Sequence, residues 1–299
     1  MATSGKYFLG IDGGATHCRA RLRDAAGAPI AERTGPAANI YINFDAAMHV
    51  VRNLIGTIAD EAGIAVSARP QIALGLGLAG LQSKVEADRV TLALGGFASV
   101  RADNDAVIAC LGAHGGDDGA IVIAGTGSAG MAMLGGRRIL IGGRGFLIGD
   151  EGSGARIGCD AVRAAVLAHD GLGPSSELTA SLMRRFSNDP NEAARWAAHA
   201  APGDYGELAP LVFVSAAHGD PVAEAIIAKA IRAVCALTEA LHKAGAQRIA
   251  LLGGAGAAIK PLLPRKVSAW LSEPLTDATD GAILLAGGAL PASMLERAP

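Results

Sequence analysis

The sequence predicts an α/β protein built from two similar halves with a cleft between them. Two observations carry this prediction. Each half begins with an apolar strand that runs into a glycine turn, first at 7–14 and again at 120–127, and further short strands follow each turn. At 299 residues the chain is also larger than most single hydrophobic cores, which favours two lobes over one.

The first half is predicted to be a strand meander followed by alternating helices and strands. Extended segments at 7–11, 18–24 and 29–34 are separated by glycine- and alanine-rich turns. Residues 45–62 repeat apolar side chains at helical spacing and stop at Gly63. We then expect a buried strand over 71–77, a helix over 84–94 and a strand over 100–102 that leads into Asp103-Asn104-Asp105.

The second half is predicted to repeat this opening and then to become mainly helical. The text GGDDG at 115–119 marks the boundary. Strands are expected at 120–124, 131–134 and 137–143, helices over much of 153–244, a strand at 248–252 and a final helix over 281–295. We therefore expect an N-terminal lobe of 1–117, joined by a C-terminal helix at about 285–299, and a C-terminal lobe of 118–284.

The composition points to a small molecule as the partner. The 26 basic and 28 acidic side chains include no basic run, so neither a nucleic acid nor an anionic membrane surface is indicated. The start of the chain has no signal-peptide pattern, and no segment approaches the roughly 18 apolar residues that span a bilayer. We expect a soluble, cytoplasmic protein. Its four cysteines, at 18, 110, 159 and 235, are predicted to be isolated buried thiols.

Two matches to the GxGxxG pattern do not indicate a dinucleotide site. GLGLAG spans 75–80 and GTGSAG spans 125–130. A dinucleotide fingerprint needs a helix directly after the glycines, whose N-terminus binds the pyrophosphate. Strand-like text follows Gly130, and after Gly80 a helix begins only beyond LQS. No GK[ST] triplet occurs anywhere in the sequence, which excludes a Walker A loop.

The turns DGGAT (12–16) and AGTGS (124–128) occupy equivalent points of the two halves. Facing each other, they would present amides and the hydroxyls of Thr16, Thr126 and Ser128 to the phosphates of one nucleotide. A bare carboxylate at Asp12 would repel phosphate, but Asp12 can hold Mg²⁺, directly or through water, and the metal offsets that repulsion. The alternative is that both turns are plain glycine hairpins.

With these turns in place, the sequence resembles a known family. IDGGAT, AGTGS about 110 residues later and LLGGAG near the C-terminus are similar to the phosphate and adenosine loops of the actin-like ATPases, whose two duplicated lobes are ribonuclease H-like. LGLAG (76–80), NDA (104–106) and GGRGFLIGDEGSG (142–154) further resemble the BadF/BadG/BcrA/BcrD ATPase family, most closely its N-acetylglucosamine kinase branch. The resemblance covers nearly the whole chain.

The resemblance implies a role for each matching residue. Asp105 is the catalytic base that accepts the proton of the sugar 6-hydroxyl; the alternative is that Asp105 caps the following helix, as Asn104 and Asp103 could equally well do. The implied phosphate contacts come from Gly13, Gly14, Thr16, Gly125, Thr126, Gly127 and Ser128, and the adenosine contacts from Gly253, Gly254 and Gly256. The implied sugar contacts come from Asn39, Gly80, Asp105, Thr126, Gly145 and Asp150.

Two further assignments keep an alternative from the residues themselves. Asp150 could instead provide ordinary acidic capping for the helix that begins near Ser153, and Glu151 is left without a role. The glycines at 253, 254 and 256 could form a plain helix cap. This chain also carries Arg144 where similar kinases often have an aromatic residue, so the pocket for the sugar 2-substituent is expected to differ.

The expected function is the ATP- and Mg²⁺-dependent phosphorylation of an amino sugar at its 6-hydroxyl. N-acetylglucosamine is the first choice, glucosamine the alternative, and the resemblance implies a homodimer. A more distant alternative is the ATPase activator of a 2-hydroxyacyl-CoA dehydratase, which needs cysteines for an iron–sulfur cluster; GFLIGDEGSG contains none. A sugar-sensing repressor would need an N-terminal DNA-binding segment, and this chain starts directly with its first strand.

Overall fold

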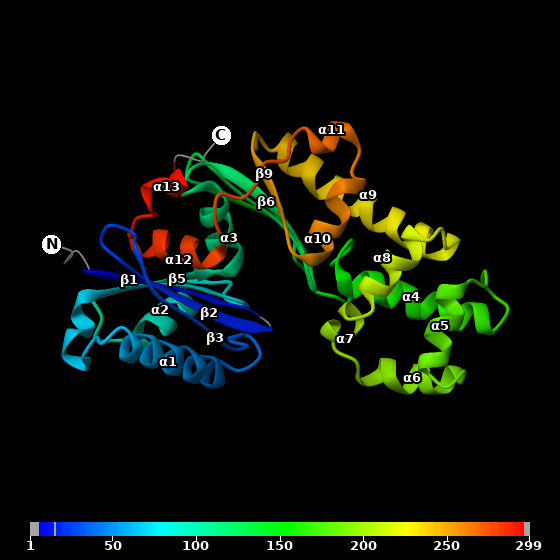
Figure 1. The fold of residues 1–299 in the computed structure, drawn as a ribbon, viewed down its shortest axis with the longest axis horizontal. Helices are drawn as coiled ribbons and strands as arrows, with labels where there is room; N and C mark the ends of the chain where they lie inside the picture. The colour runs from blue at the N-terminus through cyan, green and yellow to red at the C-terminus, as the bar shows by residue number, and fades with distance from the viewer. Residues whose placement is uncertain (1–5, 15, 296–299) are drawn as a thin grey trace. The chain divides into compact units, whose positions relative to one another are not determined.

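The computed structural model describes residues 6–14 and 16–295, and the chain divides into two compact units (Figure 1). Unit 1 is Met1–Asp118 with Glu273–Pro299, and unit 2 is Gly119–Ser272. The chain thus returns to unit 1 at Glu273, earlier than the 285 expected from the sequence. Each unit carries one sheet and its own helices, and each is described separately below.

The sheet of unit 1 has five strands in the order β3-β2-β1-β4-β5. The strands are β1 (Tyr7–Gly13), β2 (His17–Asp24), β3 (Pro29–Pro36), β4 (Ile72–Leu78) and β5 (Ser99–Asn104). The first three form the predicted antiparallel meander, and β4 and β5 continue the sheet in parallel with β1. The carboxyl ends of β1, β4 and β5 therefore lie along one edge of the sheet.

One face of this sheet is covered by α1 (Phe44–Glu61), which the apolar periodicity predicts, and by α2 (Lys84–Ala93). The strands contribute the larger side chains of alternate positions, such as Leu9, Ile11, Leu74 and Leu76, all at most 1% exposed. A short 3₁₀ helix, Val66–Gln71, leads from α1 into β4. This face is the main hydrophobic core of unit 1.

The opposite face is covered by α3 (Asp105–His114) and α12 (Ala278–Ala286), and glycines allow their close approach (Figure 1). A Cβ on Gly75 would lie 1.8 Å from the Ala282 carbonyl oxygen, and one on Gly77 would lie 2.2 Å from Ile108 Cγ1. These glycines of GLGLAG therefore serve helix packing.

The final helix predicted over 281–295 is wrong. The structure has α12 over Ala278–Ala286 and then the separate α13 (Ala292–Leu295). Gly287, in the left-handed conformation at φ 90°, ends α12, and Pro291 stands before α13. Apolar residues continue past Gly287 in the sequence, and for this reason the apolar pattern alone predicts one helix instead of two.

Unit 2 repeats the strand order of unit 1 with four strands, β8-β7-β6-β9. They are β6 (Gly119–Ala124), β7 (Ser128–Leu134), β8 (Arg137–Gly142) and β9 (Ile249–Leu252). The first three form an antiparallel meander, and β9 pairs in parallel with β6, as β4 does with β1. The prediction of two related α/β halves is confirmed by this correspondence.

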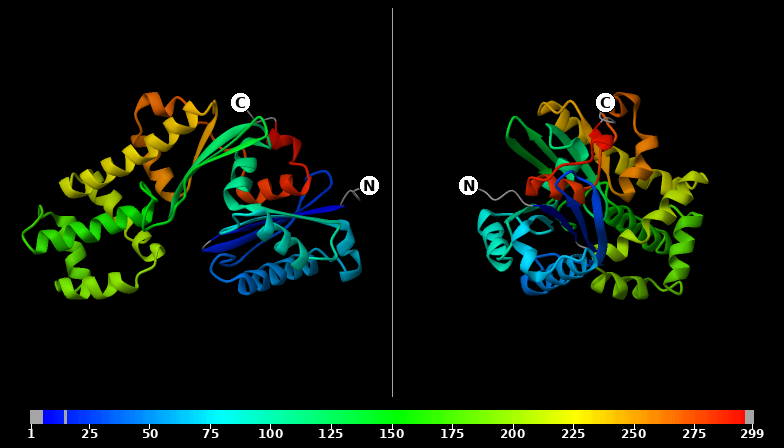
Figure 2. Two further views of the ribbon diagram at one scale, coloured as in Figure 1. Left: turned by 180° about the vertical axis from the view of Figure 1, so that it is seen from behind. Right: turned by 60° about the vertical axis from the view of Figure 1, so that its left-hand side comes forward.

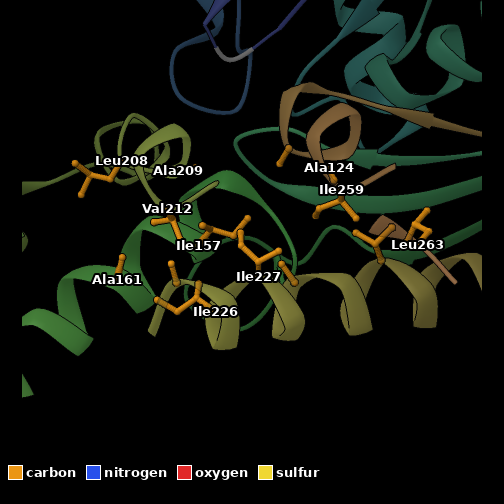
Figure 3. Close-up of a cluster of buried hydrophobic side chains, with 14 of the residues drawn as sticks. Ala124, Ile157, Ala161, Leu208, Ala209, Val212, Ile226, Ile227, Ile259 and Leu263 are labelled. Carbon is orange, nitrogen blue, oxygen red and sulfur yellow. The ribbon is translucent and has the colours of Figure 1, made fainter. Parts of the chain in front are cut away.

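The helices of unit 2 pack on this sheet and on each other (Figure 2). They are α4 (Gly154–His169), α5 (Glu177–Arg185), α6 (Pro190–His199), α7 (Pro202–Gly206), α8 (Ala209–Ala217), α9 (Pro221–Lys243), α10 (Gly254–Ile259) and α11 (Arg265–Ser268), with a 3₁₀ turn at Lys260–Leu262. Ile157, Val212 and Ile227 meet in the buried cluster between α4, α8 and α9 (Figure 3). In the described part of the chain, no helix is long and apolar enough to span a membrane.

Candidate active site

The first glycine turn joins β1 to β2 and is held from both sides. The Gly14 amide donates to the His17 carbonyl at 2.9 Å, which closes the hairpin. The Gly13 carbonyl accepts from the Ala79 amide at 2.7 Å, and the Gly14 carbonyl accepts from the Ala38 amide at 3.1 Å. A Cβ on Gly13 would lie 2.5 Å from Leu78 Cδ2, so a side chain there would require Leu78 to shift. The Gly14 amide is used within the hairpin.

Asp12 precedes this turn and forms an ion pair with Arg19 on the neighbouring strand. The two residues are register partners of β1 and β2, and Arg19 Nη2 donates to Asp12 Oδ2 at 2.9 Å. The Asp12 side chain is 18% exposed and that of Arg19 is 39% exposed. The Asp12 carboxylate, for which Mg²⁺ is the predicted partner, is therefore also balanced by a guanidinium.

Asp105 is the first residue of α3, directly after β5, and the helix cap belongs to Asn104. The Ala106 amide donates to Asn104 Oδ1 at 2.9 Å and also to Asp105 Oδ1 at 2.9 Å, and Asn104 Nδ2 donates to the Leu81 carbonyl at 3.0 Å. Burial raises the pKa of the Asp105 carboxyl, and the negative charge of Asp12 adds to this rise against the opposing backbone hydrogen bonds. A carboxyl with a raised pKa is suited to accept a proton.

The structure brings Asp12 and Asp105 to one edge of the sheet. Asp12 is the register partner of Gly77 on β4, and Gly77 is in turn the partner of Asp103 on β5. Two strand spacings, about 10 Å, therefore separate the backbones of β1 and β5 at this level. The predicted metal residue and the predicted base thus share this edge, in agreement with their electrostatic coupling.

Asn39 and Gly80 lie together beside this edge. Asn39 Oδ1 accepts from the Tyr41 amide at 2.9 Å, which forms a tight turn. Gly80 has φ 85°, and a Cβ on it would lie 2.4 Å from Tyr41 Cβ and 2.8 Å from Asn39 Oδ1. The backbone of Gly80 therefore packs directly on the Asn39 turn, and Tyr41 and Ile42 next to it are 77% and 78% exposed.

In unit 2, the second glycine turn, between β6 and β7, is held by the N-terminus of α4. The Gly125 amide donates to the Gly127 carbonyl at 2.9 Å within the turn. The Gly154 and Ala155 amides donate to the carbonyls of Gly125 at 2.8 Å and Thr126 at 3.3 Å. Across the residues that the structure describes, the amides of Thr126 and Gly127 donate to no protein group. These two amides are the ones that could bind phosphate oxygens.

The predicted residues Ser128 and Asp150 interact with each other beside this turn. The Ser128 amide donates to Asp150 Oδ1 at 3.2 Å, and its hydroxyl donates to the Glu151 carbonyl at 2.8 Å. Ser128 is 6% exposed, so its hydroxyl is engaged within the protein. Asp150 itself has φ 61°, an uncommon conformation for a residue with a side chain. Capping of α4 is provided by Ser153, whose hydroxyl accepts from the Arg156 amide.

Arg156 of α4 donates hydrogen bonds to the loop that carries Gly145 and Asp150. Arg156 Nη2 donates to the carbonyls of Phe146 and Gly149, and its guanidinium lies 4.9 Å from the centre of the Phe146 ring. Gly145 has φ 85°. Glu151, left without a role by the sequence, forms ion pairs of 3.5 Å with Arg156 and Lys229. Arg144 is exposed.

The glycines after β9 approach the second turn. Gly253 has φ 92°, and a Cβ on it would lie 2.5 Å from the Ala124 carbonyl oxygen and 2.8 Å from the Gly125 amide. Gly256 packs on Leu251, whereas a Cβ on Gly254 would meet no protein atom within 4 Å. Gly253 is thus needed for the close contact with the turn, and Gly254 faces open space.

Asp12 is the side chain at these turns that could hold a metal ion. Within residues 6–14 and 16–295, no cluster of three or more His, Cys, Asp or Glu side chains is arranged to hold one. A Mg²⁺ that arrives with a nucleotide takes its other ligands from phosphate and water and needs only one or two carboxylates. The donor set therefore fits a metal brought by the nucleotide.

Sequence reasoning missed two arginines. Arg19 pairs with Asp12, and Arg156 donates to backbone carbonyls of the loop that carries Asp150. The stretch CRARLRD places arginine at every second position of β2, so period-2 alternation could have indicated a row of guanidinium groups on one face. No comparable pattern marks Arg156, because its partners are backbone carbonyls of a preceding loop.

Comparisons with known proteins find relatives that match most of the chain. The chain is 38% identical over 281 residues to a glucosamine kinase of Vibrio cholerae, covering 94% of this chain and 96% of the relative. It is 30% identical to an N-acetyl-D-glucosamine kinase of Dictyostelium discoideum, covering 80% of each protein.

Solved structures of sugar kinases are similar to this chain in fold. A proposed N-acetylglucosamine kinase from Chromobacterium violaceum superposes with a TM-score of 0.88 at 33% identity, covering 94% of this chain and 99% of that one. A glucokinase of the ROK family from Streptomyces griseus matches with a TM-score of 0.56 at 16% identity, over 94% of this chain and 98% of that one. This distant likeness concerns the fold alone, and the predicted actin-like ATPase fold is confirmed.

The family model for the BadF/BadG/BcrA/BcrD ATPases matches residues 9–286, which contain both glycine turns, Asp105 and the loop of Asp150. This chain belongs to the BadF/BadG/BcrA/BcrD ATPase family.

Proposed function

We propose that this chain is an ATP- and Mg²⁺-dependent kinase that phosphorylates an amino sugar at its 6-hydroxyl. The observation that carries the proposal is the half-buried carboxyl of Asp105, which has a raised pKa and lies at the same sheet edge as Asp12. One of its oxygens accepts from the Ala106 amide. The named relatives are kinases of glucosamine and of N-acetylglucosamine, which supports an amino sugar as the acceptor.

In this mechanism Asp105 acts as the general base. Its carboxylate accepts the proton of the 6-hydroxyl as that oxygen bonds to the γ-phosphorus of ATP, and the bond from phosphorus to the bridging oxygen breaks to release ADP. Mg²⁺, when bound, neutralises charge on the phosphate oxygens. Asp12 would hold this metal, through water while its oxygen is paired with Arg19.

The phosphate contacts are assigned to the two glycine turns. In the second turn, the amides of Thr126 and Gly127 and the Thr126 hydroxyl would bind phosphate oxygens, because the Ser128 hydroxyl is already engaged. In the first turn, Thr16 has its hydroxyl 3.0 Å from His17 Nδ1 on an exposed surface and would contribute that hydroxyl. Gly13 and Gly14 would then shape the turn, and Gly125 would do the same in unit 2.

The sugar and adenosine contacts follow the remaining predicted residues. In unit 1, the Asn39 and Gly80 turn would bind sugar hydroxyls. In unit 2, Gly145 and Asp150 are assigned to the sugar as well. Gly253, Gly254 and Gly256 would accept the adenosine, with Gly254 facing the ligand because no protein atom lies near it.

The proposal is tested by ADP release with N-acetylglucosamine, glucosamine, N-acetylmannosamine and glucose, followed by phosphorus NMR to locate the new ester. We expect phosphorylation at the 6-position of one of the two glucosamine compounds at the highest kcat/KM. N-acetylglucosamine is our first choice, and the 38% identity to a glucosamine kinase favours glucosamine as the second candidate.

Two outcomes would contradict the proposal. ADP release that is independent of every sugar would indicate an ATPase without a sugar acceptor. Stoichiometric iron in anaerobically purified protein, with absorbance of an iron–sulfur cluster, would instead support an activator of a 2-hydroxyacyl-CoA dehydratase.

A further inference from the structure

Strand β2 carries three arginines on one face of the unit 1 sheet. Arg19, Arg21 and Arg23 occupy alternate positions, so their side chains share the face that the segment around α12 covers. The side chains are 39%, 14% and 3% exposed in that order. Exposure therefore rises toward the end of the strand that adjoins the first glycine turn.

The two inner arginines are engaged by carboxylates of the α12 segment. Arg23 donates to both oxygens of Asp280 at 2.8 and 2.9 Å and to the Gly27 carbonyl at 2.8 Å. Arg21 donates to both oxygens of Asp277 at 2.9 Å and also to Glu32 at 2.9 Å. Bidentate pairs of this kind fix α12 to the sheet, so both arginines serve the fold.

Arg19 has a different set of contacts. In the described part of the chain it makes one short bond, to Asp12 Oδ2 at 2.9 Å, and one longer ion pair, to Asp277 Oδ2 at 3.7 Å. A guanidinium group has five N–H donors, so Arg19 retains donor capacity that Arg21 and Arg23 have used. Its single short contact is also with the carboxylate that precedes Gly13 and Gly14.

Resting on the kinase function proposed above, we propose that Arg19 is a positioning residue that acts through Asp12. Arg19 balances the Asp12 carboxylate beside the first glycine turn, and this balance sets how strongly nucleotide binding depends on Mg²⁺. The pair keeps one oxygen of Asp12 occupied and offsets the charge of its carboxylate.

The physical consequence is that the affinity for nucleotide depends on whether Mg²⁺ is bound. Without metal, phosphate oxygens approach a neutral pair; once Arg19 is removed, they approach an uncompensated carboxylate and are repelled. With Mg²⁺ present, the cation supplies the missing positive charge. Loss of Arg19 should therefore weaken metal-free nucleotide binding much more than metal-bound binding.

The test measures ADP and ATP dissociation constants by calorimetry, with Mg²⁺ and with a chelator, for the full-length chain. In Arg19→Met the ratio of the metal-free to the metal-bound dissociation constant should rise by about two- to fivefold, the size of one partly exposed charge contact. Arg19→Lys keeps the charge and should stay near the wild-type ratio. Arg33→Met removes an exposed pair with Glu61 elsewhere in the same sheet and serves as the matched control.

A double-mutant cycle with Asp12→Asn tests whether Arg19 affects nucleotide binding through Asp12. If Arg19 acts through Asp12, the change caused by Arg19→Met shrinks once Asp12 is neutral. An unchanged ratio in Arg19→Met would overturn the inference, and an equally large effect in the Asp12→Asn background would overturn the route through Asp12. Failure of the kinase function itself is seen separately, as absence of sugar phosphorylation by the wild-type protein used for the same titrations.

Discussion

The guanidinium of Arg23 on β2 and the carboxylate of Asp280 on α12 form a buried bidentate ion pair, with bonds of 2.8 and 2.9 Å and side chains 3% and 0% exposed. The two residues are 257 positions apart in the sequence. The pair therefore joins the segment that follows unit 2 to the sheet formed at the start of the chain.

Removing one partner of this pair should strongly destabilise the protein. Arg23→Met leaves Asp280 buried without its bidentate partner, and we expect the free energy of unfolding to fall by about 3–5 kcal/mol. Urea denaturation followed by circular dichroism measures this change. Arg33→Met, which breaks an exposed pair with Glu61, should cost about 1 kcal/mol or less; equal losses in the two variants would contradict the prediction.

The same pair should make stability depend on acidity. Burial alone would raise the pKa of Asp280, but hydrogen bonds from Arg23, Thr276 and Arg21 outweigh it and hold the pKa below its ordinary value. A carboxylate with a depressed folded-state pKa contributes stability above its unfolded pKa of about 4 and loses it as the pH falls further. Melting temperatures from pH 7 to pH 3 should show this loss, with a shallower slope in Asp280→Asn.

Asp105→Asn tests the proposed base. The amide preserves shape but cannot accept the proton, so kcat should fall by about 10²–10⁴-fold while the dissociation constant for ATP stays close to wild type. Because burial and the charge of Asp12 raise the pKa of Asp105, wild-type activity should decline on acidification at a pH above the usual aspartate range. Asp103→Asn is the control, and turnover at the wild-type rate by Asp105→Asn would refute the role.

The glycine contact between β4 and α12 should tolerate no side chain. Gly75→Ala places a Cβ 1.8 Å from the Ala282 carbonyl oxygen, so the helix must move away, and we expect a loss of at least about 1–3 kcal/mol. Gly56→Ala in α1 meets no atom within 4 Å and should instead stabilise the helix by about 0.5–1 kcal/mol. Thermal melting of both variants provides the comparison.

Substitutions of Gly253 and Gly254, which are adjacent in the predicted adenosine loop, are expected to have different effects on stability and on ATP binding. Gly253→Ala would force a Cβ to 2.5 Å from the Ala124 carbonyl oxygen and should lower the melting temperature. Gly254→Ala meets no protein atom, so its melting temperature should stay near wild type while the KM for ATP rises. An unchanged KM for ATP in Gly254→Ala would argue against adenosine at this position.

Local patterns predicted most of the elements, because apolar periodicity and glycine turns are written in short stretches of the chain. The three opening strands, the helix beginning near Asp45 and the strand into Asp103 are found within two residues of their predicted bounds. The final helix was wrong, because a glycine inside apolar text does not reveal its left-handed conformation.

The candidate site was predictable in its residue types and less so in their bonding. The text NDA could not separate Asn104 from Asp105 as the helix cap. In the structure Asn104 precedes α3 and accepts from the Ala106 amide, and its side-chain amide donates to the Leu81 carbonyl, 23 positions away. Likewise, the AGTGS turn suggested the hydroxyls of Thr126 and Ser128 as phosphate contacts, whereas the Ser128 hydroxyl donates to the Glu151 carbonyl.

The sequence by itself determined the family, the two-lobed α/β class and the glycine turns, since these depend on short motifs and on the order of local elements. Only the tertiary structure decided which polar groups remain available. Arg19 meets Asp12 through strand register, and Gly154 meets Gly125 through the placement of a helix end. Such bonds join residues that are distant in the chain or belong to different elements. They provide hydrogen-bond partners for polar groups that folding removes from water. Because the two partners are not neighbours in the sequence, no local pattern predicts which groups will pair.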